Sequence, residues 1–207
     1  MLLNRVRCIS LAGAGLFLTA GTASALHLMG GKVPSTFAEG FLSDIGHPII
    51  GLDHLAFLLA LGIAVGVARL SFVSPFLFLV AMACGVAAHV AAITLPAAEL
   101  IVAISVLVAG ILLVIDSRVP AGWWIGLFIL AGFFHGYAYG ESIYGAEPAP
   151  LAAYLVGLVA VQTALTVGVA LATRALWKLS GVAPRLAGAA ISGVGFAVLV
   201  TQLIPAP

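Results

Sequence analysis

Two short clusters of histidine and carboxylate residues lie where long apolar runs begin or end. The first cluster holds His47, Asp53 and His54, and the second holds His135 and Glu141. In each cluster five residues separate a histidine from a carboxylate. Imidazole and carboxylate together suit first-row divalent metals such as nickel, cobalt and zinc. Because ionisable groups at membrane depth are costly to keep, these positions favour a metal-handling role.

The elements that must position these clusters are apolar helices. Of the 207 residues, 63% are hydrophobic and only 7% are charged, and the mean hydropathy is +1.26. A soluble domain carries roughly 25% charged residues, so this composition predicts an all-α integral membrane protein. Six runs each approach the roughly 20 residues that span a bilayer as helix. They are Pro48–Ala68, Phe72–Leu95, Glu99–Ile115, Ala121–Gly140, Leu151–Ala172 and Leu186–Ile204.

The amino-terminal region reads as a leader followed by a short arm. Residues 1–25 combine a basic start, a short apolar core and an Ala23-Ser24-Ala25 cleavage site, which predicts a signal peptide. An uncleaved first transmembrane helix is the alternative. Residues 26–46 are predicted to form a short extracytoplasmic arm, and residues 47–207 a bundle of six transmembrane helices.

The basic residues predict the orientation in the membrane. They fall in alternate connections, after the first, third and fifth runs: Arg69, Arg118, Arg174, Lys178 and Arg185. Cytoplasmic loops carry the excess of Lys and Arg, so both mature termini are expected outside a bacterial cytoplasmic membrane. Aromatic residues near the run ends are expected to form interface belts: Trp123, Trp124, Trp177, Tyr139 and Tyr144. Cys84, inside an apolar run, is interpreted as a small buried hydrophobe.

The first cluster opens a helix. Pro48 suits the first helical position, and the seven-residue separation puts His47 and His54 on one face, with Asp53 about 100° away. A helix amino terminus carries partial positive charge, so a cation bound there needs a nearby carboxylate. The alternative is a polar triad that ties helices together by hydrogen bonds.

The second cluster ends a helix. Gly132, Gly136 and Gly140 recur every four residues and form a ridge that another helix can approach closely, with His135 beside it and Glu141 after it. Packing glycines with a hydrogen-bonded histidine are the alternative. Two further residues are weaker candidates. His89 is either a ligand from another helix or a core hydrogen-bonder, and Glu99 either a vestibule carboxylate or a helix cap.

At these residues the chain resembles the HupE/UreJ family, membrane proteins associated with hydrogenase and urease maturation. The family pattern His-x5-Asp-His matches His47, Asp53 and His54. The second pattern, Phe-His-Gly-x-Ala-x-Gly followed by Glu, matches residues 134–141, although Glu141 comes one residue earlier than in many members. The leader, arm and six helices also match, so the resemblance covers essentially the whole chain.

The resemblance implies a permease that takes up Ni²⁺ or Co²⁺ as its transported substrate. The expected metal residues are His47, Asp53, His54, His135, Glu141 and His89. No organic cofactor and no nucleic-acid partner are expected. The partners are the lipid bilayer and the metal ion, and a homo-oligomer is left open. In the cytoplasmic half, Gln162 and Thr166 are the candidates for the ion path.

Three other functions compete with transport. A metalloprotease would need His-Glu-x-x-His, which the chain lacks, so no enzymatic activity is expected. A haem-binding protein could use the same histidines as axial ligands. A metal-binding accessory protein without transport is the remaining alternative.

Overall fold

The computed structural model describes residues 34–41, 51–115, 119–176 and 182–204. This part of the chain contains helices and no strands, which confirms the all-α prediction. The principal helices are α3 (Leu52–Val67), α4 (Val73–Val90), α5 (Ala98–Ile115), α6 (Ala121–Gly140), α7 (Pro148–Leu176) and α8 (Ala183–Leu203). A short 3₁₀ turn, η2 (Glu141–Ile143), follows α6 directly.

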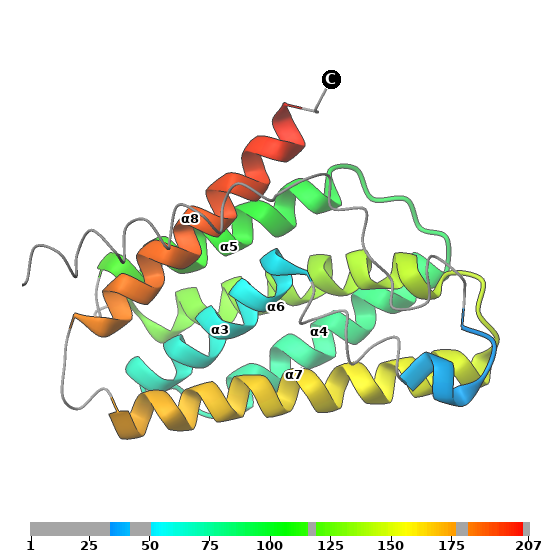
Figure 1. Cartoon of the computed structure of the whole chain (residues 1–207), viewed down its shortest axis with the longest axis horizontal. Helices are drawn as coiled ribbons and strands as arrows, with labels where there is room; N and C mark the ends of the chain where they lie inside the picture. The colour runs from blue at the N-terminus through cyan, green and yellow to red at the C-terminus, as the bar shows by residue number, and fades with distance from the viewer. Residues whose placement is uncertain (1–33, 42–50, 116–118, 177–181, 205–207) are drawn as a thin grey trace, which may run out of the picture.

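The helices pack in three close pairs, α4 with α6, α5 with α8, and α3 with α7 (Figure 1). Each pair meets through glycine. A Cβ atom at Gly136 would overlap the Met82 carbonyl, one at Gly62 would crowd Val169, and one at Gly110 would crowd Ser192. Small residues let helix backbones approach closely where lipid provides no hydrophobic drive between them.

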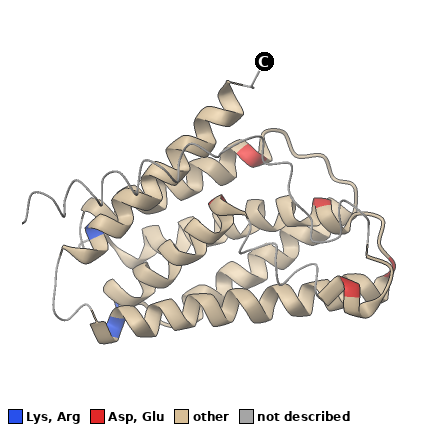
Figure 2. Ribbon diagram, viewed as in Figure 1, with Lys and Arg blue, Asp and Glu red and all other residues tan. Residues whose placement is uncertain are grey.

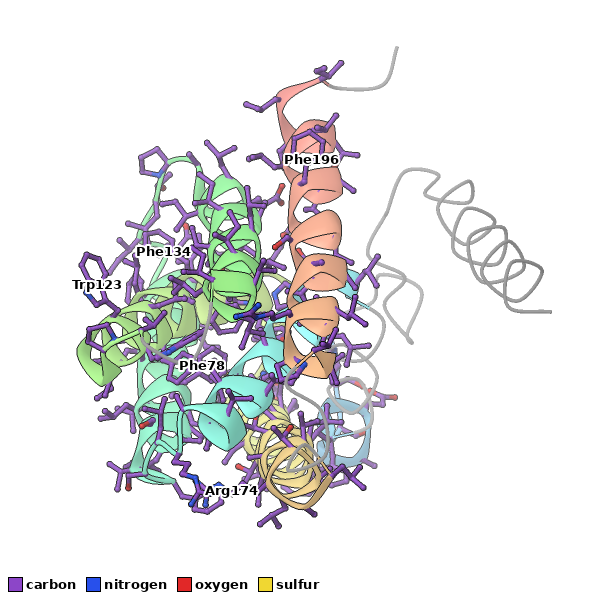
Figure 3. All side chains as sticks on the ribbon, turned by 90° about the vertical axis from the view of Figure 1, so that its left-hand side faces the viewer. Phe78, Trp123, Phe134, Arg174 and Phe196 are labelled. Atoms are coloured by element: carbon purple, nitrogen blue, oxygen red, sulfur yellow. The ribbon has the colours of Figure 1, made fainter. Side chains whose placement is uncertain are left out.

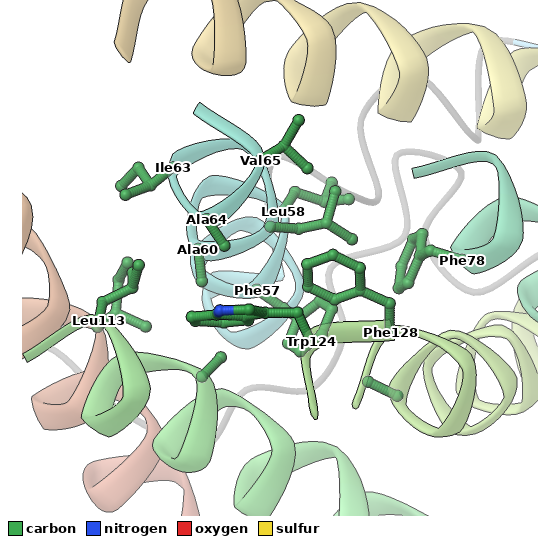
Figure 4. Close-up of a cluster of buried hydrophobic side chains, with 14 of the residues drawn as sticks. Phe57, Leu58, Ala60, Ile63, Ala64, Val65, Phe78, Leu113, Trp124 and Phe128 are labelled. Carbon is green, nitrogen blue, oxygen red and sulfur yellow. The ribbon is translucent and has the colours of Figure 1, made fainter. Parts of the chain in front are cut away.

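Helix α3 lies at the centre and contacts each of the other five helices. Its side chains Phe57, Leu58, Leu61 and Ala64 are all at most 1% exposed. Figure 4 shows side chains of α3 meeting an aromatic group that includes Phe78, Trp124 and Phe128. A helix that is apolar all round is expected to be buried on all sides, and α3 is.

The outer faces of the helices are apolar, as lipid contact requires. Phe196 and Trp123 are exposed and lie on the outside of the bundle in Figure 3. Five helices, α4 to α8, are long and apolar enough to cross a membrane, whereas α3 has 16 residues. The predictions for Trp124 and Cys84 were wrong: Trp124 is buried in the core instead of lying in an interface belt, and Cys84 is exposed on α4.

Charges separate to the two ends of the bundle (Figure 2). The helix bounds assign the described charges to these ends: Arg69 follows α3, Arg174 lies in the last turn of α7 and Arg185 in the first turn of α8. At the opposite end, Glu99 lies in the first turn of α5, Glu141 follows α6 and Glu147 precedes α7, while Asp53 lies in the first turn of α3. Arg174 also fastens α7 to the end of α3. Its Nη2 donates to the Leu70 carbonyl at 2.8 Å, and its guanidinium lies 4.4 Å from the centre of the Phe72 ring.

The second helix is shorter than predicted. α4 ends at Val90 rather than Leu95, and the connection to α5 includes left-handed backbone at Ala92 (φ 58°) and Ala97 (φ 57°). Pro96 disfavours helical backbone at Leu95. The Tyr137 hydroxyl then holds this connection by accepting from the Leu95 N–H at 3.1 Å. His89 therefore lies in the last turn of α4.

The predicted leader lies outside the described residues, and the arm is described only over residues 34–41. Residues 37–41 form a short helix whose start is a capping box, in which Thr36 Oγ1 accepts from the Glu39 N–H at 3.2 Å. The Glu39 carboxylate accepts from the Ser35 N–H at 2.8 Å, which lowers the pKa of that carboxyl. A Cβ at Gly40 would overlap the Pro150 carbonyl, so this segment packs against the start of α7.

Candidate metal site

Asp53 and His54 form a fixed pair in the first turn of α3. Asp53 Oδ1 lies 2.8 Å from His54 Nδ1 and also accepts from the His54 backbone N–H at 2.8 Å. An ionised carboxylate only accepts hydrogen bonds, so the imidazole donates through Nδ1–H. The lone pair of the neutral ring is then on Nε2. Metal-binding histidines commonly donate their other ring N–H in this way, to a carboxylate, a backbone carbonyl or water.

His135 is held by a hydroxyl from a third helix. Its side chain is 1% exposed, and its Nε2 lies 3.0 Å from Ser105 Oγ on α5. The Ser105 hydroxyl donates its single hydrogen to the Val102 carbonyl at 2.7 Å. Ser105 Oγ therefore accepts the Nε2–H of His135. This arrangement leaves the lone pair of the His135 ring on Nδ1.

The two imidazoles meet edge to face between α3 and α6. The His54 and His135 ring centres are 4.8 Å apart, and their planes meet at 77°. Tyr139 lies against His54 with ring centres 4.3 Å apart, and Phe57 lies against His135 at 4.7 Å. The structure thus brings together three of the predicted metal residues inside aromatic walls.

This group is a partial ligand set. Within the described parts of the chain, no three His, Cys, Asp or Glu side chains converge closely enough to hold a metal ion. Asp53 and His54 are nevertheless adjacent on α3, and the His135 ring on α6 contacts the His54 ring, so two imidazoles and one carboxylate lie close together. Such a set requires a further ligand, or a small movement of the two helices, to bind a cation.

The basic-end side of this group is closed by apolar packing. Phe57 and Phe78 stack with ring centres 5.5 Å apart, and Phe78 lies 6.3 Å from His135. Phe128 and Trp124 continue the same cluster toward the basic end (Figure 4). The imidazoles therefore lie between an aromatic layer and the acidic end of the bundle.

Two of the remaining predicted residues, His89 and Glu141, form a second group nearer the acidic end. His89 and Glu141 line a cavity of about 470 Å³ together with Glu99, Tyr137 and Gln202. His89 packs against Tyr137 with ring centres 4.6 Å apart and ring planes tilted by 52°. Its Nδ1 is buried and has no hydrogen-bond partner among the described residues. Glu99, left open above between a vestibule and a cap, lies on this cavity.

His47 falls outside the described residues, so its predicted face-sharing with His54 stays a prediction. Two residues that shape the site were missed. Ser105 could have been found, since it is the one hydroxyl in the apolar run of α5. Tyr139 was assigned to an interface belt, but it is 1% exposed and packs on His54. Tyr144, by contrast, is half exposed, as a belt residue would be.

Comparison with known proteins identifies the family. The profile of the HupE / UreJ protein family matches residues 14–198, most of the chain. Protein HupE of Rhizobium leguminosarum bv. viciae is 29% identical over 166 residues, which cover 79% of this chain and 86% of that protein. No solved structure matches the chain significantly. The two histidine motifs, helices α3 to α7 and most of α8 lie within the matched region, and the chain belongs to the HupE / UreJ family.

Proposed function

We propose that this protein is a secondary permease that carries Ni²⁺ or Co²⁺ into the cytoplasm. The HupE / UreJ family is associated with nickel and cobalt uptake for hydrogenase and urease, and it is a permease and accessory family rather than a known enzyme family. In this proposal α3 is the first of six transmembrane helices.

The observation that carries the proposal is the Asp53–His54 pair facing His135 inside an apolar bundle. Asp53 holds the His54 ring through Nδ1, and Ser105 holds the His135 ring through Nε2. The nitrogens left to bind a metal are therefore His54 Nε2 and His135 Nδ1. Buried imidazoles of this kind match the preference of nickel and cobalt for nitrogen ligands. The Asp53 carboxylate offsets both the charge of the cation and the positive end of the α3 dipole. His47 is proposed as a further ligand, because it lies two turns before His54 in the sequence.

The cavity at the acidic end gives the ion its route of entry. Glu99 and Glu141 supply negative charge there, and His89 supplies a nitrogen ligand. Carboxylates around an opening raise the local concentration of cations. We assign this cavity to capture and the paired imidazoles to selection. A site with a small number of ligands of mixed type binds the ion weakly enough for it to leave again, which conduction requires.

The charge separation supports inward transport. Basic residues at one end are expected to face the cytoplasm, so the acidic end and its cavity face outward. An ion would meet the carboxylates first, then the imidazoles, and then the basic end. The proposed location is the cytoplasmic membrane of a bacterium, with both mature termini outside.

The test is metal uptake by cells that lack their own nickel and cobalt importers. Cells expressing the protein should accumulate Ni²⁺ or Co²⁺, and competition between the two ions should show which is preferred. His54→Ala and His135→Ala should lose most uptake at unchanged membrane abundance. Uptake no greater than that of cells without the protein would refute the permease assignment.

A further inference from the structure

The candidate site ends at an aromatic layer, so the next polar group toward the basic end decides where an ion can go. Helix α7 carries a buried stripe that faces α3. Three polar side chains lie on it, each at most 5% exposed: Gln162, Thr166 and Thr173. Gln162 is the most buried of the three, at 0%.

The packing of α3 on α7 fixes the depth of Gln162. A Cβ at Gly62 would meet the Thr166 carbonyl at 2.9 Å, and one at Gly66 would meet the Ala170 carbonyl at 3.0 Å. The two helices therefore run parallel and in step. Continuing this register one turn toward the acidic end puts Leu58 level with Gln162, and one further turn puts His54 level with Leu158. Gln162 thus lies about 6 Å from the level of His54 along the bundle, given the helical rise of 1.5 Å per residue.

Neither Nε2 nor Oε1 of Gln162 has a hydrogen-bond partner among the described residues, although both atoms are buried. A buried amide without partners is unfavourable, and in native proteins such a group calls for an explanation. The neighbours on its stripe, Leu158 and Ala170, show that apolar side chains are accepted on this surface.

We infer that Gln162 is the next ligand for the transported ion on the basic-end side of His54 and His135. The inference rests on the permease function proposed above. The amide oxygen is a neutral donor, and first-row metals such as nickel bind it less strongly than imidazole. A step from two imidazoles to one amide oxygen therefore moves the ion from a selective site to a weaker one, from which it can leave.

The test compares Gln162→Met with Leu158→Met. Methionine fills a volume similar to that of either residue, so each change is tolerable for packing, and only the first removes an amide. Both proteins should reach wild-type membrane abundance, and Gln162→Met should unfold at the same temperature as wild type or higher. Ni²⁺ binding to the purified protein should be unchanged within about twofold, whereas Ni²⁺ uptake should fall at least about tenfold for Gln162→Met alone, the loss typical of a disturbed metal site.

Three results bear on the inference. Wild-type uptake by Gln162→Met would overturn it. Lower stability of Gln162→Met than of Leu158→Met would also overturn it, because the amide would then be a structural hydrogen-bonding group. If wild type itself shows no more uptake than His54→Ala, the permease function fails; if wild type transports and Gln162→Met matches it, only the role of Gln162 fails.

Discussion

Asp53 performs two tasks from one position. Its Oδ1 fixes the His54 ring through Nδ1, and its charge lies in the first turn of α3, where the helix end is partly positive. Removing the charge leaves a cation close to that positive end. Removing the hydrogen bond lets the imidazole turn away from His135. The carboxylate therefore should be the least replaceable group of the site.

The substitution Asp53→Asn removes the negative charge of the side chain but keeps its shape, so it tests the charge alone. The amide is nearly the same size and retains an oxygen for His54, but it carries no negative charge. We expect Ni²⁺ uptake to fall at least about tenfold, the range seen when a partner of a metal ligand is lost. The matched control is Glu147→Gln, which removes an exposed carboxylate just before α7 and should transport normally. Equal uptake by the two variants would mean that charge at Asp53 is unimportant.

Ser105 is expected to set the affinity of His135. Ser105→Ala removes the acceptor of the Nε2–H, and leaving that buried donor unpaired costs about 1–3 kcal/mol. The ring can then turn or change tautomer, so the Ni²⁺ concentration for half-maximal uptake should rise about tenfold or more. Ser105→Thr retains the hydroxyl and should stay near wild type. Unchanged kinetics in Ser105→Ala would remove Ser105 from the site.

The sequence predicted the histidines and Asp53 because ionisable residues in apolar runs are conspicuous. It did not predict Ser105, although that residue carries the one hydroxyl group of α5, or Tyr139, because the partners of both side chains come from helices distant in the sequence. It also grouped Glu141 and His89 with the paired imidazoles. The structure puts these two on a separate cavity, because α4 ends early and η2 turns Glu141 away after Gly140.

At the scale of the helices, the glycine ridge of α6 positions His135. Gly132 and Gly136 admit the backbone of α4, while His135, between them, reaches Ser105 on α5 and His54 on α3. The ridge was predicted from its four-residue spacing, and the close packing is confirmed. The helix that it contacts could not be predicted, because every apolar helix in the chain offers a similar surface.

Gly136→Ala tests the ridge against a control in the same helix. A Cβ at position 136 would overlap the Met82 carbonyl, whereas one at Gly126 has no atom within 4 Å. We expect Gly136→Ala to lower the free energy of unfolding by about 1–3 kcal/mol through overpacking. Gly126→Ala should be neutral or slightly stabilising, because alanine favours helix. Thermal unfolding in detergent compares them, and equal stability would show that the ridge is not tightly packed.

At the scale of the whole molecule, composition and charge placement predicted most of the architecture. Helix α6 agrees with its predicted run at both ends, and α7 is longer by three residues at its start and four at its end. The length of an apolar run predicts a transmembrane helix well, because about 20 apolar residues are needed to cross the hydrocarbon core of the bilayer as a helix. The order of packing did not follow from the sequence, and neither did the central position of α3, since both depend on which small residues meet across the bundle.

The separated charges predict the orientation, which single cysteines can test. In a protein with Cys8 and Cys84 replaced, Glu147→Cys should react with an impermeant thiol reagent in intact cells. Ser71→Cys, in the connection between α3 and α4 at the basic end, should react only after the membrane is opened. Labelling of Ser71→Cys from outside would reverse the proposed direction of transport.

The central claim is that this chain alone moves a divalent metal through the Asp53, His54 and His135 group. The most direct measurement is Ni²⁺ and Co²⁺ entry into vesicles that hold the purified protein and a trapped metal-sensing dye. We predict rapid entry with wild type, entry near that of empty vesicles with Asp53→Ala, and wild-type entry with Glu147→Gln. Entry at the wild-type rate through correctly folded Asp53→Ala protein would contradict the account.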